Sequence, residues 1–297
     1  MRDEVADRVI QDNYRQIWAI SVAERESELH FDWYWRFIVS LERKEILDRT
    51  LEALPDDEVL SERRAARKGL TRPELACLLA YAKLSLYPQI LASNLPDDPY
   101  LSTVLERYFP APLRQRFANE IQEHRLRREI IATIATNSLV NRAGITFAQR
   151  MQDQSGLDIP AIARAYMSAR DVFALRDLWS AIDAVEDRVA QRVGVAMILE
   201  TQRMLERATR WFLRRRHHYS EIAATVECFA PAVAAMAASL PQWVVGLERS
   251  VIEESVQHYQ EQGVSTALAA HIASLDALVC TLGLSEIAPT VELELMP

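Results

Sequence analysis

The chain has 297 residues, 49% of them hydrophobic and 26% charged, which is enough to bury a sizeable core in one large domain or two ordinary ones. Its formal net charge of −8 argues against a general nucleic-acid binder, because such a protein needs positive charge to displace counterions from phosphates. The N-terminus lacks the apolar core of a signal peptide, and the apolar stretches at 230–240 and 266–273 are too short to span a bilayer. We therefore expect a cytoplasmic protein whose partners include neither nucleic acid nor a membrane.

The periodicity of the apolar residues predicts the fold class. Only 7 glycines occur in the whole chain, strand-type alternation is almost absent, and helical spacing of apolar residues is nearly everywhere. The pattern predicts an all-α fold, a multi-helix bundle with one or two long helices.

The first two helices are predicted over 3–28 and 31–42. The second helix has unusual aromatic density, with Phe31, Trp33, Tyr34, Trp35 and Phe37 close together. Such density is typical of a packing seam between helices or domains, and a stack against a ligand is the alternative. We expect 1–55 to form N-terminal helices with an aromatic packing seam.

A capping box begins the helix that follows Gly69. Thr71 and Glu74 can each accept from the other's amide, and a proline in the first turn loses no hydrogen bond. Asp98 before Pro99 repeats this kind of helix start. Arg72 is the residue that the cap does not explain.

A single long helix is predicted from about 112 to Asn141. One face of it is expected to carry Leu126, Ile130, Thr133, Asn137 and Val140, which recur by three and four. Thr133 and Asn137 on this otherwise apolar face imply buried hydrogen bonds. We interpret them as a polar clamp to a neighbouring loop, and an effector-binding role is the alternative.

Further starts and stops follow along the chain. Gly144 is expected to end the long helix in the left-handed conformation, and Thr146 with Gln149 forms a second potential capping box. A helix is predicted over 160–174, and then a very long helical pattern over 175–216, with a possible kink at Gly194, which suggests a bundle or a coiled-coil hairpin.

The remaining chain is richer in alanine. Pro231, Pro241 and Gly263 are expected to separate three further helices. We therefore predict a helical core over 56–218 and an Ala-rich helical tail over 219–297, cut at its C-terminal end from a longer protein.

Motifs for nucleotide or metal chemistry are absent from the sequence. A dinucleotide fold needs clustered glycines, whereas the closest pair here, Gly144 and Gly156, is twelve residues apart. Cys77, Cys228 and Cys280 lack zinc-site spacing and are expected to be buried reduced thiols. We expect no catalytic, cofactor-binding or metal-binding residue in the chain.

Histidines and basic runs offer weaker signals. His124 and Glu129 are five residues apart and do not share a helix face well, so a hydrolase built on His124 would need another carboxylate nearby. The basic runs at 125–128 and 214–218 are interpreted as solvated faces or as salt-bridge partners for another domain, and a phosphate-binding role is the alternative.

Several segments together resemble one family. They are Gly-Leu-Thr-Arg-Pro-Glu-Leu-Ala at 69–76, Ala-Tyr-Ala-Lys at 80–83, Leu-Pro-Asp-Asp-Pro at 95–99, Tyr-Phe-Pro at 108–110, His-Arg-Leu-Arg-Arg-Glu-Ile-Ile-Ala-Thr at 124–133 and Val-Asn-Arg-Ala-Gly at 140–144. Supporting matches are Asp12-Asn13-Tyr14-x-Gln16, Leu47-Asp48-Arg49, Thr146-Phe147 and Arg164-Ala165-Tyr166. The order and spacing resemble the helical C-terminal region of the very large bacterial NAD-specific glutamate dehydrogenases over about 10–216. Lys44-Glu45 departs from it, where the family tends to have a glycine.

The resemblance implies a parent protein similar to enzymes that oxidatively deaminate L-glutamate to 2-oxoglutarate and ammonia with NAD. It implies that the NAD and glutamate sites lie in an upstream catalytic domain, and none of the family's catalytic positions matches a residue here. The family's size is associated with homo-oligomers and, in some members, with allosteric control by amino acids.

We therefore interpret the chain as a non-catalytic helical region that serves domain packing, oligomerisation or allosteric control. The alternative is a free-standing all-α interaction module with no enzymatic role. Arg72, Asn137, Asn141 and Arg142 are the polar candidates for contacts with another domain or an effector.

Overall fold

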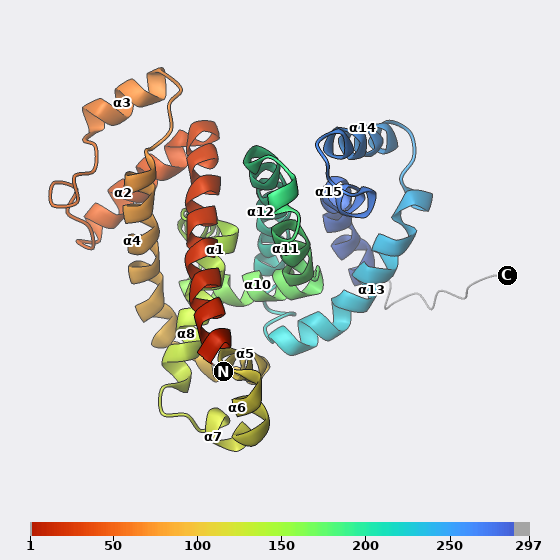
Figure 1. The fold of residues 1–297 in the computed structure, drawn as a ribbon, viewed down its shortest axis with the longest axis horizontal. Coiled ribbons are helices and arrows are strands. Elements are labelled where there is room, and N and C mark those ends of the chain that lie inside the picture. The colour runs from red at the N-terminus through yellow and green to blue at the C-terminus, as the bar shows by residue number, and fades with distance from the viewer. Residues whose placement is uncertain (1, 288–297) are drawn as a thin grey trace. The chain divides into compact units, whose positions relative to one another are not determined.

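The computed structural model describes residues 2–287, and no strand occurs among them, so the predicted all-α class is confirmed (Figure 1). The chain divides into two compact units, 1–163 and 164–297, with the division inside α10. The three segments predicted from the sequence stay a prediction.

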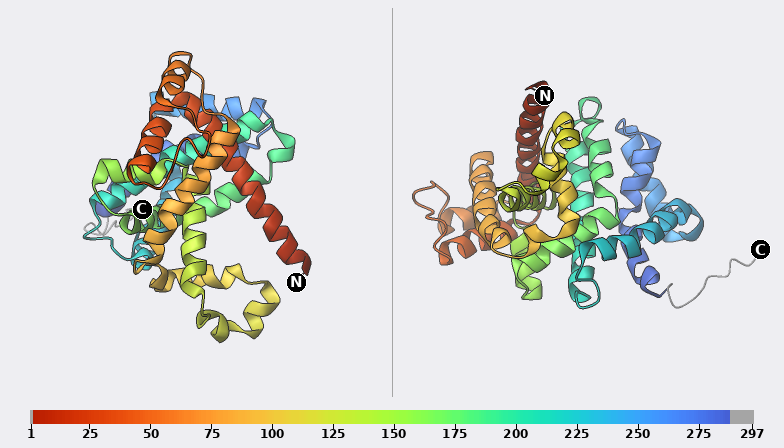
Figure 2. Two further views of the ribbon diagram at one scale, coloured as in Figure 1. Left: turned by 90° about the vertical axis from the view of Figure 1, so that its left-hand side faces the viewer. Right: turned by 90° about the horizontal axis from the view of Figure 1, so that it is seen from below.

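The first unit is built on α1, α4 and α8. Its helices are α1 (Arg2–Leu29), α2 (Phe31–Arg43), α3 (Asp57–Ala65), α4 (Arg72–Leu91), η1 (Leu95–Asp97), η2 (Pro99–Leu101), α5 (Ser102–Tyr108), α6 (Ala111–Arg116), α7 (Ala118–Gln122), α8 (Arg127–Ser138), η3 (Leu139–Ala143), α9 (Phe147–Ser155) and the start of α10 (Ile159–Val172). α4 packs against both α1 and α8 (Figure 2). Leu75 and Leu78 of α4 and Ala132 of α8 are fully buried there, so the core is aliphatic.

The second unit is built around α12 and α15. Its helices are α11 (Leu175–Asp183), η4 (Glu186–Arg188), α12 (Gln191–Arg214), α13 (Ile222–Trp243), α14 (Leu247–Glu261) and α15 (Thr266–Ile287). α15 packs against α12, α13 and α14, and α11 packs against α12. Met197, Leu205 and Phe212 line the buried face of α12.

The predicted long helix over 112–141 is wrong. Short α6 and α7 meet at Phe117, whose φ of −127° and ψ of 39° are not helical, and a turn precedes α8. In that turn the Leu126 amide donates to His124 Nδ1 at 3.1 Å, a local bond that competes with the helix. Pro110 and Pro112 favour a helix start but cannot extend it through these breaks.

The predicted polar face of that helix is also wrong. Leu126 is 54% exposed, and Thr133 is exposed with its hydroxyl donating to the Glu129 carbonyl at 2.7 Å. The buried face instead carries Ile131, Ala132, Ala135 and Thr136. α8 then continues into the π-helical turn η3, which shifts the register of the residues after it.

The long pattern over 175–216 is broken as well. α11 ends at Asp183 and α12 begins at Gln191, and the two helices pack together as a hairpin, which was one of the two interpretations. Gly194 is buried inside α12. Periodicity continued across the break because both helices place apolar residues on the shared face.

Three helices follow, as predicted, but the prolines do not separate them. Pro231 and Pro241 lie within α13, whereas Gly263, with φ +89°, follows the end of α14.

The expectation of buried thiols is wrong for Cys228 and Cys280, which are exposed, and Cys77 is half-buried. Burial and the neighbouring Glu52 carboxylate raise the pKa of Cys77 to about 11, so this thiol stays protonated at neutral pH.

The first capping box is confirmed and the second is not. The Thr71 amide donates to Glu74 Oε2 at 2.7 Å. Thr146 is fully buried, and its hydroxyl accepts from Arg150 Nε at 3.2 Å instead of capping α9. Gly144 ends η3 with φ 109° and ψ 155°, an extended conformation with positive φ rather than the expected left-handed helical one.

Candidate functional site

A buried group of polar side chains joins α1, α2 and α9. Glu26 is 4% exposed, Tyr34 is fully buried and Arg150 is 8% exposed. The Tyr34 hydroxyl donates to Glu26 Oε2 at 2.5 Å, and Arg150 Nη2 lies 3.8 Å from Glu26 Oε1. The acid, the phenol and the guanidinium therefore satisfy one another in the interior, as buried charges must.

Arg150 also links this group to the aromatic residues of α2. Its guanidinium carbon lies 3.8 Å from the centre of the Trp33 ring, a distance typical of a cation–π interaction. The Trp33 ring stacks on His30, with ring centres 3.9 Å apart. These contacts join helices that are more than a hundred residues apart in the sequence.

Burial sets the protonation state of Tyr34. Burial first, and then the negative charge of Glu26, raise the pKa of Tyr34 well above its ordinary value. Tyr34 is thus a neutral donor at any physiological pH. Because the three side chains are almost inaccessible to solvent, the group is suited to locking helices rather than to reacting with a substrate.

Sequence reasoning identified the aromatic residues but not the two charges beside them. Spacing could have found Glu26, because it follows the buried Val22 by four residues on the same face of α1. Arg150 was not identified from the sequence, because the neighbouring Thr146 and Gln149 were interpreted as a helix cap.

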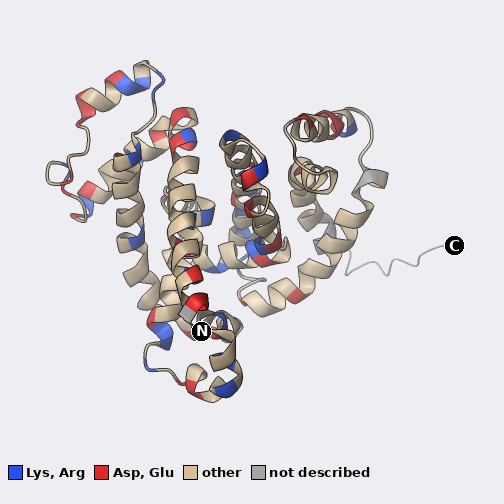
Figure 3. Ribbon diagram, in the orientation of Figure 1, with Lys and Arg blue, Asp and Glu red and all other residues tan. Residues whose placement is uncertain are grey.

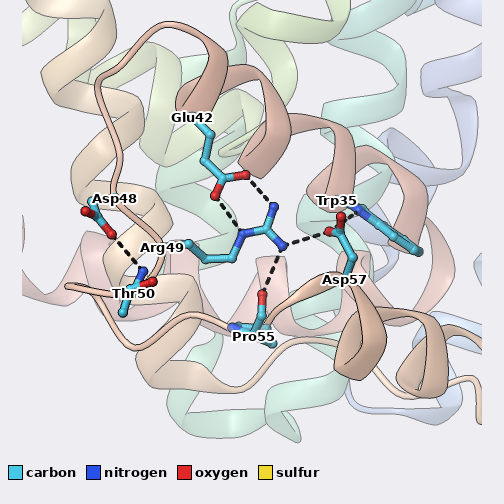
Figure 4. A network of polar contacts seen from close by, with 7 residues as sticks. All are labelled: Trp35, Glu42, Asp48, Arg49, Thr50, Pro55 and Asp57. Carbon is cyan, nitrogen blue, oxygen red and sulfur yellow. Dashed lines mark hydrogen bonds and ion pairs between the residues drawn. The ribbon is translucent and has the colours of Figure 1, made fainter.

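A second polar network surrounds Arg49 in the loop between α2 and α3 (Figure 4). The guanidinium bonds both carboxylate oxygens of Glu42, reaches Asp57 Oδ1 at 2.7 Å, and donates to the Pro55 carbonyl at 3.3 Å. Trp35 Nε1 donates to the same Asp57 oxygen at 3.1 Å. The Arg49 side chain is only 13% exposed, so this motif residue holds a loop in place.

Arg72 is explained by packing between helices. Arg72 donates from Nη1 to Ser21 Oγ at 3.2 Å and to Glu24 Oε2 at 3.0 Å. These bonds join the start of α4 to α1. Its neighbour Glu74 also pairs with Arg63 at 2.6 Å. Burial raises the pKa of the Glu74 carboxyl, but hydrogen bonds from Arg63 and Thr71 outweigh burial and hold that pKa below its ordinary value.

Asn137, Asn141 and Arg142 lie together at the end of α8 and in η3, and all three are half-buried. Asn141 Oδ1 is buried without a hydrogen-bond partner among the described residues. Asn141 and Arg142 lie in the π turn, in which each backbone hydrogen bond spans one more residue than in an α-helix. A contact of these residues, or of Arg72, with another domain or an effector stays a prediction.

Lys83 is a motif residue with an altered pKa. Its ammonium group donates to Gln16 Oε1 at 3.2 Å, which joins α4 to α1. Burial lowers the pKa of Lys83 to about 8, and the charge of Asp12 opposes this shift. Two of the family-like segments therefore meet in space at this pair.

Cavities occur in both units. In the first unit, one of about 540 Å³ is lined by residues of α2, α3 and α9 that include Arg36 and Arg43, and another of about 270 Å³ adjoins the start of α2. In the second unit, an apolar cavity of about 380 Å³ lies among α13, α14 and α15.

His271 and Ser274 line the apolar cavity, but they do not form a nucleophile and base pair. The Ser274 hydroxyl donates to the backbone carbonyl of His271 at 3.0 Å and not to the imidazole ring. Burial lowers the pKa of His271.

Both basic runs contact residues of their own unit, and in the second run the Arg215 guanidinium carbon lies 4.2 Å from the centre of the Trp211 ring. Arg127 Nη2 lies 3.1 Å from Asp97 Oδ1, and Arg128 pairs with the same carboxylate and donates to the Leu91 and Ser93 carbonyls at 2.8 and 2.9 Å. Figure 3 shows Lys and Arg, and Asp and Glu, scattered over the helices of both units. No cluster of three potential metal ligands occurs within residues 2–287.

Two helices contain apolar stretches that are longer than the stretches identified in the sequence. Ile222–Leu240 and Thr266–Gly283 are long and apolar enough to cross a membrane, although only by length and composition. Core helices of water-soluble proteins pass the same test. Half of the second window is buried inside the structure, as in a core helix, but only 22% of the first is.

Comparison with known proteins supports the sequence resemblance. Residues 67–297 match the family described as "Glutamate dehydrogenase, C-terminal". The chain is similar to NAD-specific glutamate dehydrogenases of Halomonas elongata (42% identical over 97% of this chain), Pseudomonas aeruginosa (38% over 96%) and Mycobacterium tuberculosis (34% over 92%).

The chain spans only 17–18% of the length of these relatives. The matched family is defined by the C-terminal part of such proteins and covers well over half of this chain. The resemblance predicted from the motifs is therefore confirmed, and the chain belongs to the glutamate dehydrogenase C-terminal family.

Proposed function

We propose that this chain is the non-catalytic helical C-terminal region of an NAD-dependent glutamate dehydrogenase. The parent would convert L-glutamate, NAD and water to 2-oxoglutarate, ammonia and NADH in an upstream catalytic domain that holds the NAD. The observation that carries this proposal is the alignment, which covers 97% of this chain but only 18% of the relative from Halomonas elongata.

Domain packing is the role that the side chains favour most. The motif residues Arg49, Arg72 and Lys83 make contacts between helices rather than facing an open cleft. Large apolar side chains such as Ile10 and Leu247 are 65% and 81% exposed, as expected for surfaces that meet another part of a larger protein. Homo-oligomerisation of the parent and allosteric control are the other roles that we propose for this region.

Isothermal titration of the chain with NAD and with L-glutamate tests the proposal. Neither ligand should release or absorb binding heat, because the catalytic site lies elsewhere. The complete polypeptide, assayed in parallel, should reduce NAD when glutamate is added. Saturable binding of NAD or glutamate at micromolar concentration by the chain alone would overturn the non-catalytic assignment.

A further inference from the structure

One face of the N-terminal half of α1 is fastened to the first unit. Arg8 Nη1 donates to the carbonyls of Arg107 and Tyr108 at 2.8 and 2.5 Å, and Nη2 donates to the Phe109 carbonyl at 3.2 Å. Glu4 Oε1 accepts from the Ala111 amide at 3.1 Å and pairs with Arg8. This half of α1 extends away from α2 and α4 (Figure 2, left), and these bonds fix its direction.

The opposite face of α1 is apolar and exposed. Ile10 is 65% exposed, Ile17 53% and Tyr14 36%. They follow one another by four and three residues, so they form one stripe, here called the α1 stripe. Ile10 is two positions from Arg8, about 200° around the helix, so the stripe faces away from the fastened side.

The α1 stripe has the form of a docking surface. A single exposed apolar side chain is ordinary, but three on one face give the spacing with which a helix enters an apolar groove. Docking would remove the exposed apolar surface of these side chains from water, which favours association. Because α1 is already held by Arg8 and Glu4, docking would order little additional chain.

The comparisons indicate what covers the stripe. The family match begins at residue 67, after α1, yet the alignment with the relative from Halomonas elongata covers 97% of the chain and so includes most of α1. About four fifths of that relative lies outside the alignment. α1 is thus placed where the C-terminal region adjoins the rest of such a polypeptide.

We propose that the α1 stripe docks into an apolar groove on the upstream region of the same polypeptide, the part that precedes residue 1. This inference rests on the proposed function, because it takes the chain to be attached to that region. A second copy of α1 is the competing occupant and is an outcome of the test below.

Photo-crosslinking in the complete polypeptide tests the contact directly. A benzophenone amino acid replaces Ile10, and in a control protein it replaces Leu51, an 82% exposed residue between α2 and α3. After illumination, position 10 should join to peptides from the upstream region several-fold more often than position 51. Joining of position 10 to α1 of a second copy, or a yield no higher than at position 51, would overturn the proposal.

A charge variant gives a second readout. Ile10→Glu combined with Ile17→Glu, in the complete polypeptide, should increase the rate of proteolytic cleavage between the upstream region and residue 1 several-fold. Leu51→Glu should leave that rate unchanged. Equal rates in both variants would contradict docking.

The assay of NADH formation separates the two proposals. A polypeptide that forms the upstream crosslink but does not reduce NAD with glutamate refutes the enzymatic assignment and leaves the docking surface intact. A polypeptide that reduces NAD but gives no preferential crosslink at position 10 refutes the docking surface alone.

Discussion

Tyr34 shows how a single side chain joins two helices in this protein. It is fully buried on α2, and its hydroxyl donates to Glu26 of α1 at 2.5 Å. A buried carboxylate that loses a donor is left with part of its desolvation cost uncompensated. Removal of the Tyr34 hydroxyl should therefore destabilise the fold even when the ring is kept.

We predict that Tyr34→Phe lowers the free energy of unfolding by about 1–3 kcal/mol near neutral pH, since it removes one hydrogen bond to a buried charge. Tyr108→Phe is the matched control, because Tyr108 is 53% exposed, and it should change the free energy by less than about 0.5 kcal/mol. Urea unfolding of each variant measures the difference. Equal effects in the two variants would contradict the role of the hydroxyl.

The effect of Tyr34→Phe should also depend on pH. Burial raises the pKa of Tyr34 in the folded state above its value in the unfolded chain, which is about 10. A group with a raised folded pKa contributes stability that is complete below the unfolded pKa and is lost as pH rises toward the folded pKa. The gap between the native protein and Tyr34→Phe should therefore narrow above about pH 10. A gap that stays constant to higher pH would show that the pKa of Tyr34 is not raised in the folded state.

At the scale of elements, the sequence predicted helix starts better than helix continuations. Thr71 with Glu74 and Asp98 with Pro99 were readable because a cap depends on a few adjacent residues. The breaks at Phe117 and between Asp183 and Gln191 were not, because apolar periodicity continued through them. Tertiary packing decides such breaks, and a local pattern does not contain it.

In the candidate site, too, local features could be predicted from the sequence and tertiary contacts could not. Arg72 was singled out because the cap left it unexplained, and its partners Ser21 and Glu24 lie about fifty residues earlier in the sequence. Asn141, whose Oδ1 is buried without a hydrogen-bond partner among the described residues, lies in a π turn that apolar periodicity does not predict. The aromatic seam of α2 was visible, whereas Arg150 above Trp33 required the fold.

Gly69 illustrates an element contact that the motif encodes. A Cβ atom at this position would overlap Ser27 Oγ and lie 3.1 Å from the Glu28 amide nitrogen. Ser27 cannot easily move away, because its hydroxyl accepts from the Leu70 amide at 3.0 Å and donates to the Glu24 carbonyl at 2.9 Å. The glycine lets the start of α4 approach the end of α1.

We predict that Gly69→Ala destabilises the first unit by about 1–3 kcal/mol, the usual cost of forcing a methyl group into a packed contact. Gly283→Ala is the control, because nothing within 4 Å would meet its Cβ in α15, and it should be neutral or stabilising by up to about 1 kcal/mol. Chemical unfolding followed by far-UV circular dichroism compares the two. An equally stable Gly69→Ala variant would refute the close approach.

At the scale of the whole molecule, the apolar surface is uneven. α13 is drawn almost entirely without charge in Figure 3, and only 22% of its apolar window is buried. At the junction of α13 and α14 the exposed residues Trp243, Val245, Leu247 and Val251 are 57–81% accessible. The first unit has the α1 stripe and the second unit has this junction. An isolated soluble protein would normally limit such exposed apolar areas.

The junction of α13 and α14 should therefore control self-association of the isolated chain without controlling its folding. We predict that Val245→Ser combined with Leu247→Ser raises the concentration at which the chain begins to associate in light scattering, and changes the unfolding free energy by less than about 0.5 kcal/mol, because both side chains are already in water. Val233→Ser, at a residue only 4% exposed on α13, is the contrasting variant and should cost about 1–3 kcal/mol, since it buries a hydroxyl. A loss of stability in the double variant as large as that of Val233→Ser would show that the junction is part of the core rather than an open surface.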